Sequence, residues 1–199
     1  MTRIIAGSAG GRRLATPPGE ATRPTSDRVR EAVFSTLEST FGSLAGLRFL
    51  DLFAGSGAVG LEAVSRGAAH ATLVEQHRRA AGIARGNART LGLGHVDVVA
   101  MRAETFVRRS PQQSADEQGQ VPAGDGCYDV AFLDPPYTMP SEAVTALLAD
   151  LVEHRRLCRH AVVVVERSSR GPELRWPHGL RPDRTRRYGE TAVWYGRAS

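Results

Sequence analysis

Two short stretches of the chain carry residues whose types and spacing could do chemistry. In the first, LDLFAGSGAVGL at residues 50–61, Gly55, Gly57 and Gly60 complete a G-x-G-x-x-G pattern. A glycine-rich turn between a strand and a helix lets a ligand approach the backbone at the helix N-terminus. NAD and S-adenosylmethionine both bind at such turns, so the glycines alone leave the choice of cofactor open.

Asp51 and Glu75 are the acidic residues expected to face that cofactor. Asp51 precedes the glycines at the end of an apolar run, where the pyrophosphate of NAD would come close. A carboxylate there repels phosphates, whereas it attracts the amino and sulfonium groups of S-adenosylmethionine. Glu75 ends the next apolar run and is placed to bind two ribose hydroxyls, which both cofactors contain. Asp51 therefore favours the methyl donor over NAD.

The second stretch is DPPY, Asp134 to Tyr137, which directly follows the apolar run YDVAFL. When the exocyclic amino group of a base attacks a sulfonium methyl, acceptors for both amino hydrogens draw the nitrogen toward tetrahedral geometry. The Asp134 carboxylate and the Pro135 carbonyl can supply them, and the two prolines fix φ so that these acceptors are preorganised. Tyr137 offers an aromatic face on which the base can stack. Asp134 or water then takes the released proton.

Strands and helices alternate around these two stretches. Nearly continuous apolar runs separated by helices indicate a parallel sheet covered on both faces, and two further extended segments turned at Gly189-Glu190 predict an antiparallel hairpin. We therefore expect an α/β fold of the Rossmann-like, class I SAM-dependent methyltransferase type, with a mostly parallel seven-stranded sheet and a C-terminal antiparallel hairpin. The expected parallel strands lie within residues 47–53, 71–76, 96–101, 128–134 and 161–167.

The N-terminal residues 1–24 predict a small β-hairpin extension ahead of this domain. Two extended stretches flank a Ser-Ala-Gly-Gly turn and carry three arginines, Arg3, Arg12 and Arg13. In the following segment, TSDRVREAVFSTLESTF, apolar residues recur at helical spacing, and Thr25 or Ser26 is expected as the N-cap.

Residues 25–199 are expected to form a single methyltransferase domain, interrupted by a flexible surface insertion at 110–126 that is polar and aperiodic. The net charge is +5, and all 26 basic residues are arginine. Arginine fits phosphates and stacks on bases, which favours a polyanionic partner. A coding bias that replaces lysine with arginine everywhere explains the composition equally well.

The chain is expected to be cytoplasmic and to hold no metal. No apolar run approaches the length needed to cross a bilayer, and no charged-then-apolar leader follows Met1. Cys127 and Cys158 are the only cysteines, and the six histidines form no ligand-spaced cluster with them. Neither a structural zinc site nor a disulfide is expected.

The motifs resemble those of a known family. DLFAGSG together with DPPY looks like the amino-methylating class of SAM-dependent methyltransferases, and RPTSDRVREAVFSTL at residues 23–37 resembles the RsmD family more specifically. The opening RIIAGSAGGRRL also resembles that family's N-terminal extension. The resemblance therefore covers nearly the whole chain, with residues 110–126 as the main exception. It implies a monomeric enzyme that methylates the exocyclic N2 of a guanine in 16S rRNA, within an assembling or assembled small ribosomal subunit.

The resemblance also implies roles for individual residues. Ala103 and Glu104 stand where the family usually has a small residue and an Asp beside the adenine, so Glu104 is a departure, one methylene longer. Asp134 to Tyr137 would be the catalytic loop, whose first residue in the family is Asn or Asp. The residues expected to bind S-adenosylmethionine are Asp51, Phe53, Gly55, Gly57, Glu75, Ala103 and Glu104.

The RNA is expected to contact the N-terminal part of the chain. Phosphate contacts there would orient the substrate, while the choice of base would rest with the pocket. For Arg28 and Arg30, a solvent-facing position on the helix and direct RNA contact are equally compatible with the sequence. The expected substrate-binding set is Arg3, Arg12, Arg13, Arg23, Thr25 and Arg30.

Three other functions compete with this interpretation. A DNA adenine-N6 methyltransferase would also use DPPY, but the chain has no sizeable domain that could read a duplex sequence. A non-catalytic RNA-binding or assembly factor could keep the fold, although the intact Asp134 to Tyr137 argues against lost activity. An oxidoreductase ranks last because Asp51 disfavours NAD.

Overall fold

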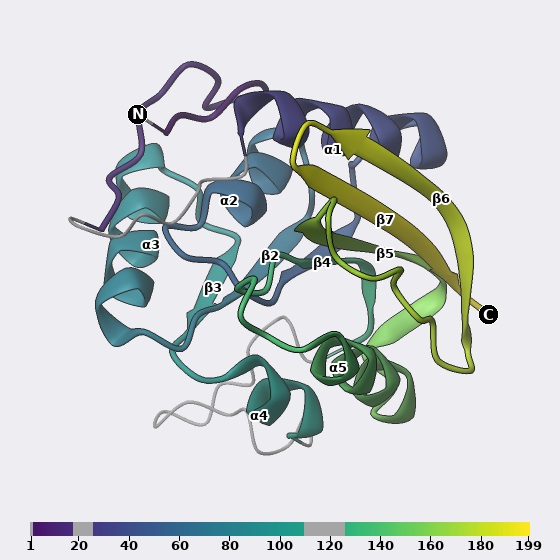
Figure 1. Cartoon of the computed structure of the whole chain (residues 1–199). Helices are drawn as coiled ribbons and strands as arrows, with labels where there is room; N and C mark the ends of the chain where they lie inside the picture. The colour runs from purple at the N-terminus through teal and green to yellow at the C-terminus, as the bar shows by residue number, and fades with distance from the viewer. Residues whose placement is uncertain (1, 18–25, 110–125) are drawn as a thin grey trace.

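The computed structural model describes residues 2–17, 26–109 and 126–199, and its strands form one seven-stranded sheet in the order β3-β2-β1-β4-β5-β7-β6 (Figure 1). β1 to β5 pair in parallel, whereas β7 runs antiparallel to both β5 and β6. The strands are β1 Arg48–Asp51, β2 His70–Val74, β3 Val96–Val99, β4 Tyr128–Leu133, β5 Leu157–Ser168, β6 Leu180–Tyr188 and β7 Thr191–Ala198. The predicted α/β fold and its C-terminal hairpin are confirmed.

Helices cover both faces of the sheet, with α1, α2 and α3 on one face and α4 and α5 on the other (Figure 1). They are α1 Asp27–Phe41, α2 Ala58–Ser65, α3 Arg78–Leu91, α4 Ala103–Arg108 and α5 Ser141–Glu153. Successive strand side chains point to opposite faces, so Phe132 and Val164 pack with α1, while Leu133 and Val165 pack with α5. Among the described residues, no helix combines the length and the apolar character that crossing a bilayer requires.

The described part of the N-terminal segment, residues 2–17, folds back on itself through one isolated β-bridge and packs onto the domain. Arg3 and Arg13 form an antiparallel bridge, and Ile4 and Leu14 are buried in the same core cluster as α1 and α2. The N–H groups of Ile5 and Ala6 donate to the Glu62 carboxylate of α2 at 2.7 and 3.0 Å. The hairpin is thus joined to the domain by core packing and by hydrogen bonds.

The start of α1 and the predicted insertion at 110–126 are described only in part. Ser26 caps α1, because its hydroxyl accepts the Val29 N–H at 3.2 Å. The alternative cap, Thr25, lies outside the described residues, as do Arg23 and Pro24. The predicted insertion at 110–126 also lies outside them, apart from Gly126.

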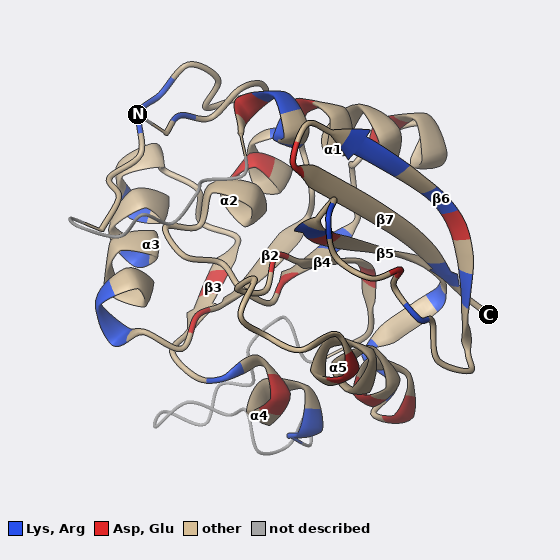
Figure 2. Cartoon of the chain, viewed as in Figure 1, with Lys and Arg blue, Asp and Glu red and all other residues tan. Residues whose placement is uncertain are grey.

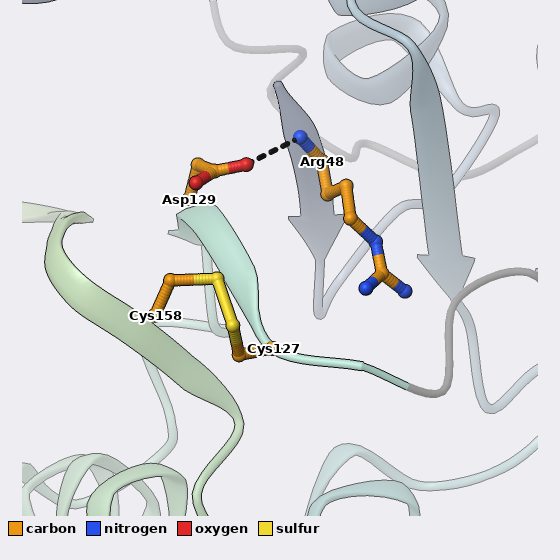
Figure 3. The surroundings of a disulfide bond; sticks show 4 residues. All are labelled: Arg48, Cys127, Asp129 and Cys158. Carbon is orange, nitrogen blue, oxygen red and sulfur yellow. Dashed lines mark hydrogen bonds between the residues drawn. A yellow bond between two sulfur atoms is a disulfide. The ribbon is translucent and has the colours of Figure 1, made fainter. Parts of the chain in front are cut away.

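The expectation that the cysteines stay unpaired is wrong. Cys127 and Cys158 form a disulfide between residues 31 positions apart, with their Cα atoms 4.8 Å from each other (Figure 3). Cys127 directly precedes β4 and Cys158 lies near the start of β5, and Tyr128 pairs with Leu157 across these two parallel strands. The sheet register therefore brings the two sulfur atoms together, at the amino ends of the strands.

Candidate active site

A cavity of about 800 Å³ lies at the carboxyl ends of β2, β1, β4 and β5, within the range of about 300–1,000 Å³ typical of small-molecule sites. Its wall contains all four residues of the predicted catalytic loop and every predicted cofactor residue except Gly57. The disulfide lies at the opposite, amino ends of the parallel strands. The cavity therefore brings together the two stretches that the sequence singled out, although residues 62–133 separate them in the chain.

Asp51, the last residue of β1, is a buried acid on the cavity wall, with 1% of its surface exposed. Its Oδ2 accepts the N–H of Gly60 at 3.2 Å, while its Oδ1 is buried with no hydrogen-bond partner among the described residues. Burial raises the pKa of Asp51 to about 7, the backbone N–H groups of Gly60 and Phe53 partly oppose this rise, and the charges of Asp134 and Glu75 add to it. Such an acceptor suits a ligand that brings a cation or an N–H group.

Glu75 follows β2 and orders the glycine-rich turn. Its Oε2 accepts the N–H of Gly55 at 2.9 Å, and its Oε1 accepts the N–H of His77 at 2.7 Å. Each carboxylate oxygen has a second lone pair, so Glu75 can still accept from hydroxyls of a ligand in the cavity. Gly55 adopts φ +53°, and a Cβ on it would meet no atom within 4 Å.

The other two glycines of the pattern serve packing. A Cβ on Gly60 would lie 2.7 Å from Leu73 Cδ1, and one on Gly57 would lie 2.8 Å from Leu73 Cδ2. Gly57 is also the N-cap of α2, with φ +86° in the left-handed region. The pattern therefore combines one glycine beside the cavity with two that let α2 approach β2 closely.

Three further predicted cofactor residues line the cavity. Phe53 follows β1, whereas Ala103 and Glu104 open α4. Ala103 is buried, and the carboxylate of Glu104 forms an ion pair with Arg102 at 3.4 Å. Glu104, which stands where the family usually has Asp, thus lines the cavity with a carboxylate that is already paired with Arg102.

Asp134, Pro135, Pro136 and Tyr137 follow β4 directly and form one side of the cavity. Tyr137 is 47% exposed, which is unusual for a large aromatic side chain and leaves its ring free to stack on a ligand. The loop backbone is held from β5, because the Arg167 guanidinium donates to the carbonyls of Pro136 at 3.3 Å and Met139 at 2.7 Å. The loop thus presents its polar groups from a fixed position.

Three of the predicted RNA-binding residues, Arg3, Arg12 and Arg13, are exposed. The side chain of Arg3 is 62% exposed and forms an ion pair with Asp27 at 3.4 Å. Arg12 donates to the carbonyls of Thr90 and Leu91 at the end of α3, and Arg13 is exposed. Arg23 and Thr25 are outside the described residues.

Arg30 requires a correction, because the structure contradicts both a solvent-facing position and direct RNA contact. Only 1% of its surface is exposed. Its guanidinium binds Asp27 at 2.8 Å and the carbonyl of Arg3 at 2.7 Å, which ties α1 to the N-terminal hairpin. Burial lowers the pKa of Arg30, and the charges of Glu62 and Asp27 counter this effect.

Two residues of the site were missed from the sequence. Glu166 lines the cavity with 4% of its surface exposed, and Arg167 supports the loop. Their position in the sequence could have indicated them. Glu166 and Arg167 directly follow the apolar run AVVVV, just as Asp51 and Glu75 stand at the ends of earlier apolar runs. Acidic residues thus end or follow β1, β2 and β4, and Glu166 lies within β5 two residues before its end. All four acids line the cavity near the carboxyl ends of neighbouring parallel strands.

Comparison with known proteins identifies relatives along most of the chain. It is 39% identical over 135 residues to ribosomal RNA small subunit methyltransferase D of Escherichia coli, a match that covers 68% of this chain and 60% of that protein. It is 34% identical over 166 residues to the protein of the same name in Haemophilus influenzae, covering 82% and 77%.

Solved structures show the same fold. The yhhF protein of Escherichia coli superposes with a TM-score of 0.82 and 29% identity, covering 99% of this chain and 97% of that one. Magnesium protoporphyrin IX methyltransferase of Synechocystis, solved with bound SAM, superposes with a TM-score of 0.62 at 16% identity over 86% of this chain and 79% of that one, which shows the fold alone. The family described as conserved hypothetical protein 95 matches residues 2–197. This protein is therefore a member of that family, the RsmD family of methyltransferases.

Proposed function

We propose that this protein transfers a methyl group from S-adenosylmethionine to the exocyclic N2 of a guanine in 16S rRNA. The observation that carries the proposal is the meeting of Asp51 and the Asp134–Tyr137 loop in one cavity, at the ends of the neighbouring strands β1 and β4. The names of the relatives support an rRNA substrate.

The cavity residues fit the cofactor. S-adenosylmethionine, when bound, supplies an electrophilic methyl group on a sulfonium. The buried Asp51 Oδ1 would accept a hydrogen bond from its amino group, and the open backbone at Gly55 leaves room for its methionine portion. Glu75 would accept from the ribose hydroxyls, with the adenine near Phe53, Ala103 and Glu104.

The loop would activate the amino nitrogen of the base. The Asp134 carboxylate and the Pro135 carbonyl would accept its two hydrogens, which localises the lone pair on nitrogen as the N–C bond forms and the methyl–sulfur bond breaks. The exposed ring of Tyr137 would stack on the base, which must leave its helix to enter the cavity. The proton released from nitrogen passes to Asp134 or to water.

The charge distribution supports an RNA partner (Figure 2). β6 is an edge strand whose arginines, Arg181, Arg184, Arg186 and Arg187, are exposed. Arg186 and Glu166 both pair with Val193 of β7, so Arg186 lies two strands from the cavity wall, roughly 10 Å away. Together with Arg3 and Arg13, these arginines would bind rRNA phosphates in the cytoplasm, with the protein acting as a monomer on the small subunit.

Substitution of Asp134 tests the mechanism. Asp134→Ala should lower the rate of methyl transfer at least about 100-fold, because one preorganised acceptor is lost. Asp134→Asn is the matched control, since it keeps a side-chain carbonyl and should retain most of the rate. Calorimetry should find S-adenosylmethionine affinity within about threefold of wild type in both variants. Equal rates for Asp134→Ala and wild type would contradict the proposed role.

A further inference from the structure

Glu166 is a buried carboxylate on the cavity wall that the proposed methyl transfer does not use. Leu133 of β4 pairs with Val165 of β5, so Asp134 and Glu166 are the next residues on two neighbouring parallel strands. Such strands lie about 4.8 Å apart, and both residues line the cavity. The two carboxylates therefore serve the same part of the site.

The sheet also determines the direction in which Glu166 points. Phe132 and Val164 are paired across β4 and β5, and both belong to the core cluster that includes α1 and α2. Strand side chains alternate, so Glu166 faces the same way as Val164. Asp51 lies on the far side of Asp134, on β1. Glu166 thus stands on the side of Asp134 that is away from the expected cofactor.

The surroundings of Glu166 hold it in a fixed relation to the catalytic loop. Its backbone pairs with Val193 of β7 in the interior of the sheet. The next residue, Arg167, donates to the carbonyls of Pro136 and Met139. β5 and the loop therefore keep one mutual geometry, which is the condition for a preorganised binding group.

We propose that Glu166 selects guanine by accepting a hydrogen bond from the N1–H of the base, an inference that rests on the proposed guanine-N2 activity. On guanine, N1–H lies directly beside the N2 amino group that Asp134 and Pro135 would hold. Adenine has an unprotonated acceptor at N1, and an ionised carboxylate has no proton to give it. The loop recognises any exocyclic amine, so the choice between bases comes from Glu166.

The substrate analogue 2-aminopurine tests this contact in combination with Glu166 variants. It keeps the N2 amino group but carries an acceptor at N1 and lacks the O6 carbonyl, so the part of its defect that depends on Glu166 reports the hydrogen bond to N1–H. We would compare single-turnover methyl transfer to small-subunit RNA that contains either guanine or 2-aminopurine at the methylated position. Wild type should prefer guanine by at least about tenfold, the discrimination expected when a site loses a hydrogen bond to a base edge.

Glu166→Gln changes the acceptor pair into an amide that can donate to N1 of 2-aminopurine. The preference for guanine should therefore fall at least about tenfold in this variant. Glu166→Asp keeps an acceptor-only group and should keep the direction of the preference. Melting temperature and S-adenosylmethionine affinity, measured on both variants, report whether the fold and the cofactor site survive.

The outcomes separate this inference from the proposed function. Wild type that methylates guanine and 2-aminopurine equally, or a preference that is unchanged by Glu166→Gln, overturns the role of Glu166 while the guanine-N2 activity stands. Wild type that methylates neither substrate overturns the proposed function itself. Should Glu166→Gln fail to fold, Glu166→Ala takes its place: it removes the acceptor, so the preference for guanine should fall, and an unchanged preference overturns the role of Glu166.

Discussion

Single residues at this site do chemistry because of where the fold puts them, and Asp51 is the clearest case. Its carboxyl is buried at the end of β1, and burial raises its pKa from 3.8 to about 7. Since the folded-state pKa lies above the unfolded one, the protonated form favours folding at low pH, and this contribution is lost as the pH rises from about 4 toward 7. A bound cation would favour the ionised form instead.

Cofactor binding should therefore depend on the ionisation of Asp51. We expect the affinity for S-adenosylmethionine to rise about tenfold between pH 6 and pH 8, because a group with a pKa near 7 ionises over this range. Calorimetric titrations across this range measure the effect. Asp51→Asn should bind more weakly and lose the additional pH dependence, while titration of the ligand's own groups is common to both proteins. A pH profile that Asp51→Asn leaves unchanged would refute the link.

At the scale of elements, the glycine-rich turn shows how packing and binding share one motif. Gly60→Ala should lower the free energy of unfolding by about 1–3 kcal/mol, since the new Cβ would lie 2.7 Å from Leu73 Cδ1. Gly82→Ala in α3 is the matched control. It adds a methyl group to a helix where no atom lies within 4 Å, and should stabilise by up to about 1 kcal/mol. Denaturant unfolding measures both, and destabilisation of the two variants by equal amounts would contradict this account.

Apolar periodicity predicted the elements well because strands and helices are local patterns. The helix that begins after Ser26 and the hairpin turned at Gly189-Glu190 both occur as expected. Features that depend on sheet register were not predictable in this way. The Cys127–Cys158 disulfide requires the pairing of β4 with β5, and the burial of Arg30 requires the hairpin to pack beside α1.

The same distinction applies to the site residues. Asp51 and Asp134 were found because each ends an apolar run beside a recognisable motif, and Glu75 because it ends the next apolar run after the glycine motif. All three line the cavity. Glu166 ends its run without a motif, so only the order of strands reveals that it lies beside Asp134. Gly57 belongs to the motif but packs against Leu73, a contact that sequence spacing does not disclose.

For the whole molecule, exposed arginines lie both at the N-terminal hairpin and along β6 (Figure 2). Replacing Arg186 and Arg187 together by Gln should weaken rRNA binding and lower the slope of log affinity against log salt by about 1 to 2, because each phosphate contact releases counterions. Arg159→Gln is a suitable control, since Arg159 is exposed next to the disulfide, at the amino end of β5 and away from the cavity. Filter binding over a salt series measures the slopes, and identical slopes for all three proteins would exclude β6 from the interface.

The reaction proposed for this cavity is methylation of N2 of a guanine in small-subunit rRNA. The direct measurement is to incubate the purified protein with methyl-labelled S-adenosylmethionine and unmethylated small subunits, then to hydrolyse the RNA and identify the labelled nucleoside. We expect the labelled nucleoside to be N2-methylguanine. Label in N6-methyladenine, whether in RNA or in added DNA, would contradict it.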